Sequence, residues 1–469
     1  MGTSISQLDI DTFVTEGLGD TTYLLAVGDE ALLVDPQRDV DRFLAAVQAR
    51  DLRLTTVLET HVHNDYVSGA RELAKRSGAE IAGPARGGYR FAHRGLSEGD
   101  EVRIAELRLV AVATPGHTPE HLAYLVYGPD PDQPLAVFTG GSLLVGSAGR
   151  TDLLGPERTE ELTRAQFATL RRLADLPDAV QVLPTHGGGS FCIASKGGTE
   201  RTSTMGQERM GNEALRETSE EAFLRSHTSG LFAFPDYYRH MAPLNRAGPR
   251  ILGGIPVPPA LSADRVAERK EKGVWVVDGR GRDSFAGAHI AGSLNIELNE
   301  QFASYVGWLV PFGDPIVLVL DRDRNAAEAA RHLMRIGYEE QVLGYLSGGT
   351  DAWEEAGLPH RTYAVGDVED LCRDLAGPDP PLVLDVRQER EHRSAALPDS
   401  LHVFVADLPE RLVEVPRDRR VWAACASGHR SAMAASMLDG AGVPVTLLAR
   451  GGIRDVLKRC APGSLNRPR

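Results

Sequence analysis

The stretch "THVHNDY", Thr60–Tyr66, carries two histidines and an aspartate at alternate positions, His61, His63 and Asp65. It follows a short apolar run that ends at Leu58, which is the pattern of a strand that ends in a loop. Imidazole and carboxylate groups that converge on one point are typical ligands of a metal ion. The residue after Asp65 is Tyr66, where a second metal ion usually has a histidine ligand. The stretch therefore predicts a metal site, either a working one or a vestigial one.

Two more histidines directly follow strand-like runs, His117 in "TPGHTPEH" and His186 in "LPTHGGG". Donors at the ends of different strands can converge on one ion, so both residues are candidate ligands. We predict a mononuclear site in which His61, His63 and His117 form a three-histidine face. Such a face holds Fe(II) and leaves the open positions that oxygenase chemistry requires. A face of two histidines and Asp65 is the alternative.

Composition limits the class of protein. The 469 residues suggest about three domains, and 42% hydrophobic with 25% charged residues is typical of a globular, soluble chain. The formal net charge of −14 argues against a nucleic-acid or anionic-membrane partner. No apolar run approaches the roughly 20 residues that span a bilayer, and no signal peptide is visible at the start. The four cysteines lie far apart, which favours a reduced, cytoplasmic location.

The order of predicted elements indicates three domains. Residues 1–250 alternate strands, turns and helices, including a hairpin that turns at Gly28 and an amphipathic helix in "DVDRFLAAVQARDL". A segment rich in proline and glycine, Arg246–Val266, follows as a boundary. Beyond it, "GVWVVDGRGRDSFAGAHIAGSLNI" resembles "PLVLDVRQEREHRSAALPDSLHVF". We therefore predict two tandem α/β domains with parallel sheets, at 260–362 and 363–469.

A cysteine loop, "CASGHRS", lies between an apolar strand-like run and a helix-like run. A thiol at a helix N-terminus is favoured as the thiolate, and successive loop N–H groups cradle an anion. We predict Cys425 as a catalytic nucleophile, with Arg430 adding positive charge. The predicted substrate-binding residues are the rest of the loop: Ala426, Ser427, Gly428, His429 and Ser431.

The first tandem copy lacks this chemistry. Asp321 and Ala326 stand where the second copy has its cysteine and its arginine, so the predicted role is a spacer or an interface. The other cysteines, Cys192, Cys372 and Cys460, are predicted to be packed thiols. For Cys192, which follows the glycine-rich turn near His186, a role near the metal is the alternative.

The first half of the chain resembles the metallo-β-lactamase superfamily in its glyoxalase II and persulfide dioxygenase branch. The motifs that carry the resemblance are "THVHNDY", "TPGHTPEH", "FTGG", "GRTDL" and "LPTHG". It implies an αββα sandwich with metal at one sheet edge. It also implies iron ligands at His61, His117 and position 141, but Gly141 has no carboxylate. The second metal of the family would use Asp65, position 66 and His186, and Tyr66 weakens that site.

The cysteine loop resembles the Cys-x-x-Gly-x-Arg-Ser loop of rhodanese sulfurtransferases, and the related phosphatase loop is one residue longer. Asp385 and Arg387 match the strand-end motif of that family and are interpreted as structural residues that orient the loop. The whole chain therefore resembles bacterial fusions of a persulfide dioxygenase-like domain with two rhodanese domains.

This resemblance implies a coupled activity. Fe(II), with Zn as the second choice, would serve oxidation of a low-molecular-weight persulfide to sulfite. Cys425 would take sulfur from a persulfide or thiosulfate and pass it to a thiol or to sulfite. The family also allows a homodimer. The alternatives are a sulfur-binding scaffold with a vestigial, metal-free site and a mononuclear thioester hydrolase.

Overall fold

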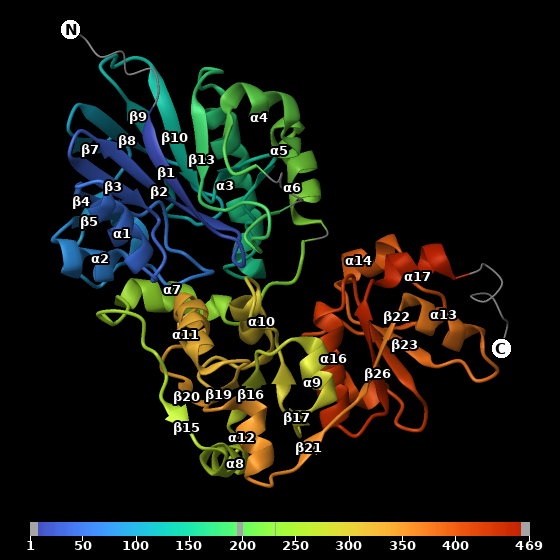
Figure 1. Ribbon diagram of the computed structural model, residues 1–469. Helices are drawn as coiled ribbons and strands as arrows, with labels where there is room; N and C mark the ends of the chain where they lie inside the picture. Colours follow the sequence, from blue (N-terminus) through green and yellow to red (C-terminus); the bar gives the residue numbers. More distant parts are fainter. Residues whose placement is uncertain (1–7, 195–199, 230, 461–469) are drawn as a thin grey trace. The chain divides into compact units, whose positions relative to one another are not determined.

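A computed structural model describes residues 8–194, 200–229 and 231–460 (Figure 1). It divides into two compact units, one made mainly of residues 1–256 and one made mainly of the residues that follow. Within the described residues, we find no helix that combines the length and the apolar character needed to cross a bilayer.

Two six-stranded sheets form the first unit. In spatial order, the first sheet consists of β1 (Asp9–Thr15), β2 (Asp20–Val27), β3 (Glu30–Val34), β4 (Arg53–Leu58), β5 (Glu80–Pro84) and β6 (Arg94–Leu96). The second consists of β14 (Ser203–Thr204), β13 (Gln181–Pro184), β10 (Pro134–Gly140), β9 (Leu122–Tyr127), β8 (Leu107–Ala113) and β7 (Glu101–Ile104). The short strands β11 (Leu143–Leu144) and β12 (Ser147–Ala148) pair with each other.

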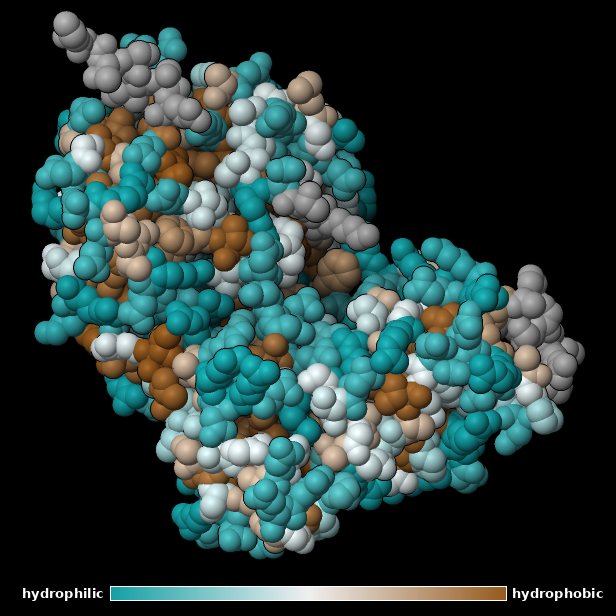
Figure 2. Space-filling view, viewed as in Figure 1, coloured by the Kyte–Doolittle hydropathy of each residue, from teal (hydrophilic) through white to brown (hydrophobic). Residues whose placement is uncertain are grey.

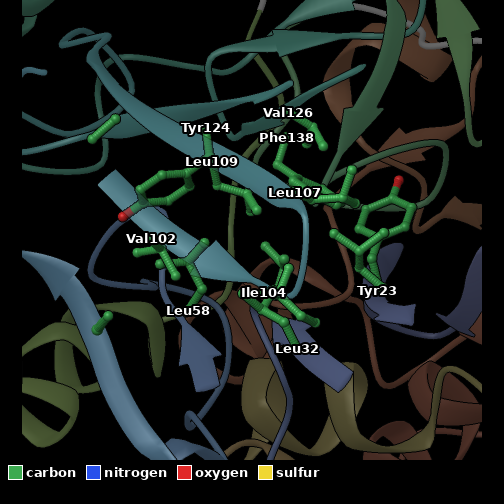
Figure 3. Close-up of a cluster of buried hydrophobic side chains, with 14 of the residues drawn as sticks. Tyr23, Leu32, Leu58, Val102, Ile104, Leu107, Leu109, Tyr124, Val126 and Phe138 are labelled. Atoms are coloured by element: carbon green, nitrogen blue, oxygen red, sulfur yellow. The ribbon is translucent and has the colours of Figure 1, made fainter. Parts of the chain in front are cut away.

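Strand alternation places one core between the sheets and one on each outer face. Tyr23 and Leu25 of β2 face the central core, which Figure 3 shows between the strands. Leu24, between them, faces the helices instead, because successive side chains of a strand point to opposite faces. Figure 1 shows α1 and α2 on one side of the sheets and α3 to α6 on the other. This is the predicted αββα sandwich.

Helices connect or follow the strands of this unit. They are α1 (Asp41–Ala49), α2 (Ala70–Ser77), α3 (Pro156–Ala174), α4 (Met205–Gly211), α5 (Glu213–Arg216), α6 (Glu220–Thr228) and α7 (Tyr238–Ala247), with the short η1 (Ala85–Gly87). The predicted hairpin turn is confirmed between β2 and β3, where Gly28 has a φ of 60°. The predicted amphipathic helix is confirmed as α1, which buries Phe43 and Val47.

The second unit repeats one five-stranded parallel sheet. The first copy has, in spatial order, β15 (Ala260–Leu261), β20 (Val342–Leu346), β19 (Ile316–Val319), β16 (Trp275–Asp278) and β18 (Leu294–Asn295). The second copy has β22 (Ala364–Asp367), β26 (Val445–Arg450), β25 (Val421–Ala424), β23 (Leu382–Asp385) and β24 (Leu401–His402). Corresponding strands occupy the same places in both sheets, as expected for a tandem repeat. A separate antiparallel pair joins β17 (His289–Ile290) to β21 (His360–Arg361).

Helices follow the strands of both copies. The first copy has α8 (Ala263–Glu271), α9 (Arg282–Gly287), α10 (Phe302–Leu309), η2 (Asp323–Asn325), α11 (Ala326–Arg335) and α12 (Gly349–Glu355). The second has α13 (Val368–Ala376), α14 (Glu389–Ser394), α15 (Leu408–Arg411), η3 (Leu412–Glu414), α16 (His429–Gly440) and α17 (Ile453–Arg459).

The visible surface is mainly hydrophilic (Figure 2).

The prediction that Cys372 and Cys460 are packed thiols is wrong. Their sulfur atoms form a disulfide across 88 residues of sequence, with the two Cα atoms 5.3 Å apart. Both side chains belong to a hydrophobic cluster that also contains Leu371 of α13 and Val456 of α17. Packing of these two helices brings the cysteines together, and sequence spacing alone does not reveal that packing.

Candidate functional site

Three imidazole rings meet at one edge of the sandwich. His61 follows β4, His117 lies in the loop after β8, and His186 lies in the loop after β13. One ligand nitrogen of each ring lies within 4.8 Å of the others, and the three rings are buried. The His61 Nε2 and His186 Nε2 atoms are 3.4 Å apart. The ends of strands from both sheets therefore build one histidine cluster.

Hydrogen bonds on the outer nitrogens turn the Nε2 atoms inward. The Nδ1–H of His117 donates to the backbone oxygen of Arg150 at 2.8 Å. His186 Nδ1 lies 2.8 Å from the Asp20 carboxylate and 3.3 Å from that of Asp65. These partners leave the Nε2 lone pairs directed at a common point, as in metal sites whose ligand histidines are oriented by outer hydrogen bonds.

His61 is oriented through a short relay. The Thr60 hydroxyl donates to Asp35 at 2.6 Å, so it can only accept from the Nδ1–H of His61, which lies 2.8 Å away. Burial lowers the pKa of His61 and His117 well below the ordinary value, so both rings are neutral. Neutral imidazole is the form that binds a metal ion.

The chemistry of the histidine cluster fits a metal ion. His117 Nε2 is buried and has no hydrogen-bond partner among the described residues. Such an unsatisfied polar atom is costly in a protein interior unless something binds it. Three neutral imidazoles suit Fe(II) or Zn(II) and leave coordination positions open.

The surroundings of His63 differ from those expected of a member of the predicted three-histidine face. Its Nε2 lies 2.9 Å from the Glu59 carboxylate and 3.1 Å from the Tyr66 hydroxyl. Burial alone would lower the pKa of His63, but the Asp35 charge and the hydrogen bonds to Asp35 and Glu59 raise it well above the ordinary value. The structure therefore groups His186, rather than His63, with His61 and His117. His63 still lies close enough to Asp65 and His186 to share a second ligand group with them.

Gly141 and Tyr66 occupy the two positions where the family motifs have ligands. A Cβ atom at position 141 would lie 2.2 Å from Cδ2 of His117, so the histidine ring fills that space. The Tyr66 ring stacks on His63 with 4.3 Å between centroids, and its hydroxyl donates to the backbone oxygen of Asp35. Both substitutions are thus accommodated by packing around the cluster.

Sequence reasoning missed several buried polar residues around the cluster. Burial raises the pKa of Asp20 to about 8 and that of Asp65 to about 7. His121, in the quoted "TPGHTPEH", stacks on His61 and accepts the Gly141 N–H at 2.9 Å. The available signal was position: Asp20 begins β2, and Asp35 directly follows β3.

The cysteine loop connects β25 to α16, as predicted. Cys425 is 1% exposed, and the Gly428 N–H donates to its Sγ at 3.2 Å. Ala426 and Ser427 are exposed, and they form the solvent side of the loop. A backbone donor aimed at the sulfur stabilises a thiolate or a persulfide anion there.

The remaining loop residues have defined surroundings. Arg430 donates two hydrogen bonds to Glu391, at 2.5 and 2.8 Å. Burial lowers the pKa of His429 to about 4, so this ring is neutral near pH 7. The Ser431 hydroxyl is buried with no hydrogen-bond partner among the described residues. Arg430 therefore brings its positive charge to the loop already paired with a carboxylate.

In both copies, the aspartate and the arginine of the strand-end motif pair with each other. Asp385 accepts hydrogen bonds from the Arg387 Nε at 2.9 Å and from its terminal nitrogen at 2.6 Å. Asp278 and Arg280 make the corresponding pair in the first copy, at 3.0 and 2.7 Å. This arrangement agrees with a structural role for the motif.

The corresponding loop of the first copy carries different side chains, and one of them bonds the turn after β20. Asp321 and Ala326 stand at the two chemical positions, and the carboxylate of Asp323 accepts the Gly348 N–H at 3.0 Å and the Ser347 hydroxyl at 2.9 Å. This loop therefore lacks the nucleophile and the arginine of the second copy.

Comparison with known proteins places both halves of the chain. Residues 16–186 match the metallo-beta-lactamase superfamily, and residues 262–356 and 367–458 match the rhodanese-like domain. Hydroxyacylglutathione hydrolase of Pseudomonas putida (strain GB-1) is 34% identical over 156 residues, which are 33% of this chain and 56% of that protein. The chain thus spans little more than half the length of such curated relatives.

Two solved structures are also similar. A metallo-beta-lactamase from Staphylococcus aureus subsp. aureus COL has 28% identity and a TM-score of 0.65, covering 72% of this chain and 99% of that chain. ETHE1 from Myxococcus xanthus has 30% identity and a TM-score of 0.44, covering 51% of this chain and 98% of that chain. The family matches at residues 16–186, 262–356 and 367–458 agree with the fold and confirm the resemblance of the sequence: the chain consists of a metallo-beta-lactamase superfamily domain followed by two rhodanese-like domains.

Proposed function

We propose that this chain is an enzyme of sulfane-sulfur metabolism with two centres. The metallo-beta-lactamase domain oxidises a low-molecular-weight persulfide to sulfite, and Cys425 transfers sulfane sulfur. The observation that carries the proposal is the inward convergence of three Nε2 atoms in a chain that also holds a thiol against a backbone N–H.

In the first domain, His61, His117 and His186 would hold the metal ion, and Fe(II) there would supply activation of O₂. The overall reaction takes RSSH, O₂ and water to RSH and sulfite. The outer sulfur loses four electrons, and O₂ accepts them. The residues around the cluster keep the imidazoles neutral and oriented, and the open positions leave room for substrate.

In the last domain, the Cys425 thiolate would attack the outer sulfur of thiosulfate or of a persulfide. A new S–S bond forms at Cys425 while the donor S–S bond breaks, and sulfite or a thiol leaves with the electron pair. The Gly428 N–H would stabilise the resulting persulfide anion. A thiol or sulfite then removes the outer sulfur and restores the thiolate.

The first experiment measures metal content and O₂ uptake of the full chain. We expect about one iron per chain in the parent by the donor count of the cluster, with persulfide-dependent O₂ uptake and sulfite release. His117→Ala and His186→Ala should lose both. His93→Gln is the matched control, because His93 lies in the same domain, outside the ligand groups found among the described residues, and its Nδ1 bonds the backbone oxygen of Phe91.

Other results would favour other functions. The hydroxyacylglutathione hydrolase relatives make thioester hydrolysis the second candidate. Metal-dependent hydrolysis of a glutathione thioester without O₂ uptake would support it. A parent protein without metal, whose sulfur transfer is intact, would instead indicate a sulfurtransferase with a vestigial metal site. Loss of thiosulfate:cyanide transfer in Cys425→Ser, by about a thousandfold or more, is expected in all of these cases.

A further inference from the structure

Arg282 lies in the copy that has no cysteine, yet it contacts the cysteine loop of the other copy. One terminal nitrogen of its guanidinium donates to the backbone oxygen of Ser427 at 2.8 Å and to that of Ala449 at 3.3 Å. Ser427 belongs to the loop, and Ala449 belongs to the neighbouring strand β26. The guanidinium thus ties the loop to the sheet beneath it.

A carboxylate of the same copy holds this guanidinium in place. Glu297 accepts the backbone N–H of Arg282 at 2.9 Å, its Nε–H at 2.9 Å and its second terminal nitrogen at 2.6 Å. The Arg282 and Glu297 side chains are only 19% and 16% exposed. A bidentate pair of this kind fixes the plane of a guanidinium, which a lysine ammonium cannot reproduce.

One peptide group connects Arg282 to the sulfur. The oxygen that Arg282 binds is that of Ser427, and the next N–H in the same peptide plane is that of Gly428. In a trans peptide these two groups point in opposite directions. Holding the oxygen therefore fixes the direction of the Gly428 N–H, which donates to Cys425 Sγ at 3.2 Å.

The backbone conformation of Gly428 allows the Arg282 guanidinium to lie close to the loop. Its φ of 92° lies in the left-handed region, and a Cβ atom there would lie 2.0 Å from the terminal nitrogen of Arg282. Only glycine satisfies both requirements without displacement.

We propose that Arg282, held by Glu297, is a positioning residue for Cys425. Arg282 acts through the Ser427–Gly428 peptide, which directs the Gly428 N–H at the sulfur. The first rhodanese-like copy would then be a working part of the catalytic centre in the second. The role of the Arg282 contact in turnover rests on the sulfur transfer proposed above. Its effect on the reactivity of the Cys425 thiol does not depend on that proposal.

The test follows alkylation of Cys425 by iodoacetamide across pH, measured by peptide mass spectrometry in the full chain. Arg282→Gln should move the midpoint of the pH–rate profile upward by about one pH unit and slow alkylation near pH 7 severalfold. Arg282→Lys should recover part of the shift, because lysine restores the positive charge but not the planar, bidentate geometry of the guanidinium. Glu297→Gln should produce a smaller shift in the same direction.

Arg361→Gln is the matched control. Arg361 also belongs to the first copy and binds a residue of the second, Asp439, at 2.7 and 2.9 Å, and among the described residues we find no hydrogen bond from it to the cysteine loop. Its variant should leave the alkylation profile unchanged. Thermal melting checks that each variant folds, and Glu297→Gln decides the matter if Arg282→Gln does not fold.

The outcomes separate this inference from the proposed function. An unchanged alkylation profile in folded Arg282→Gln, or in Glu297→Gln if only that variant folds, would overturn the positioning role even if sulfur transfer is normal. An equal shift in Arg361→Gln would also overturn it, because loss of any contact between the copies would then suffice. A shift in the Arg282 variants, with no sulfur transfer in the parent, would support the positioning role and reject the proposed reaction.

Discussion

A side chain at position 141 and the ring of His117 compete for the same space. Gly141 leaves room for the ring, and its N–H donates to His121, so the backbone here supports the cluster. The related family motif has an aspartate at this position. In this chain the third imidazole, His186, completes the group instead.

We therefore expect Gly141→Asp to impair the cluster rather than to improve it. The new side chain must displace His117, and overpacking of this kind destabilises a protein by about 1–3 kcal/mol. The variant should melt at a lower temperature and retain less metal than the parent. Gly211→Ala is the control, because a Cβ there would meet nothing within 4 Å. A Gly141→Asp protein with unchanged melting and higher metal content would contradict this account.

At the level of elements, one ion pair joins α14 to the start of α16. Burial would raise the pKa of Glu391, but its hydrogen bonds and charge interaction with Arg430 outweigh burial and lower it. A carboxylate with a lowered pKa in the folded state stabilises the protein above its unfolded pKa. That stability is lost as the pH falls through the folded pKa.

Glu391→Gln should therefore cost stability near pH 7 and little at low pH. We expect a loss of about 1–3 kcal/mol near neutrality, because Arg430 is left partly buried without its partner. Denaturant unfolding at several pH values between 3 and 7 measures the difference. Glu369→Gln is the control, since the pair of Glu369 with Arg459 is 65% exposed on both sides and should contribute less than about 1 kcal/mol. A loss that is equal at all pH values would contradict the assigned ion pair.

On the scale of the whole molecule, periodic patterns and repeated motifs were sufficient to predict the three-part architecture. The repeat of strand, loop and helix predicted two parallel sheets, and both have the same strand order. The histidines at strand ends were also predicted to approach one another. Each of these inferences depends on short-range sequence pattern, which reports which residues face a core or end a strand.

Features that depend on side chains distant in sequence were not predictable in this way. His63 turns to Glu59 and Asp35, and this choice follows from buried charges rather than from the spacing of histidines. The contact of Arg282 with Ser427 spans 145 residues, and the disulfide spans 88. Such contacts arise only when whole elements pack together.

The disulfide gives a prediction for the whole chain. Under denaturing, non-reducing conditions we expect two titratable thiols, Cys192 and Cys425, and four after reduction, from the pairing of the four cysteines. Cys372→Ser should lower the stability of the last domain by about 2–5 kcal/mol, as expected for loss of a native cross-link. Four thiols in the unreduced protein would contradict the cross-link.

The same bond changes how the chain would respond to a protease. Val413, in η3, is 90% exposed and lies between the two bonded cysteines in sequence. Exposed turns are favoured cleavage points. A cut beside Val413 would leave the two pieces covalently joined, so they would separate on a gel only after a reductant is added.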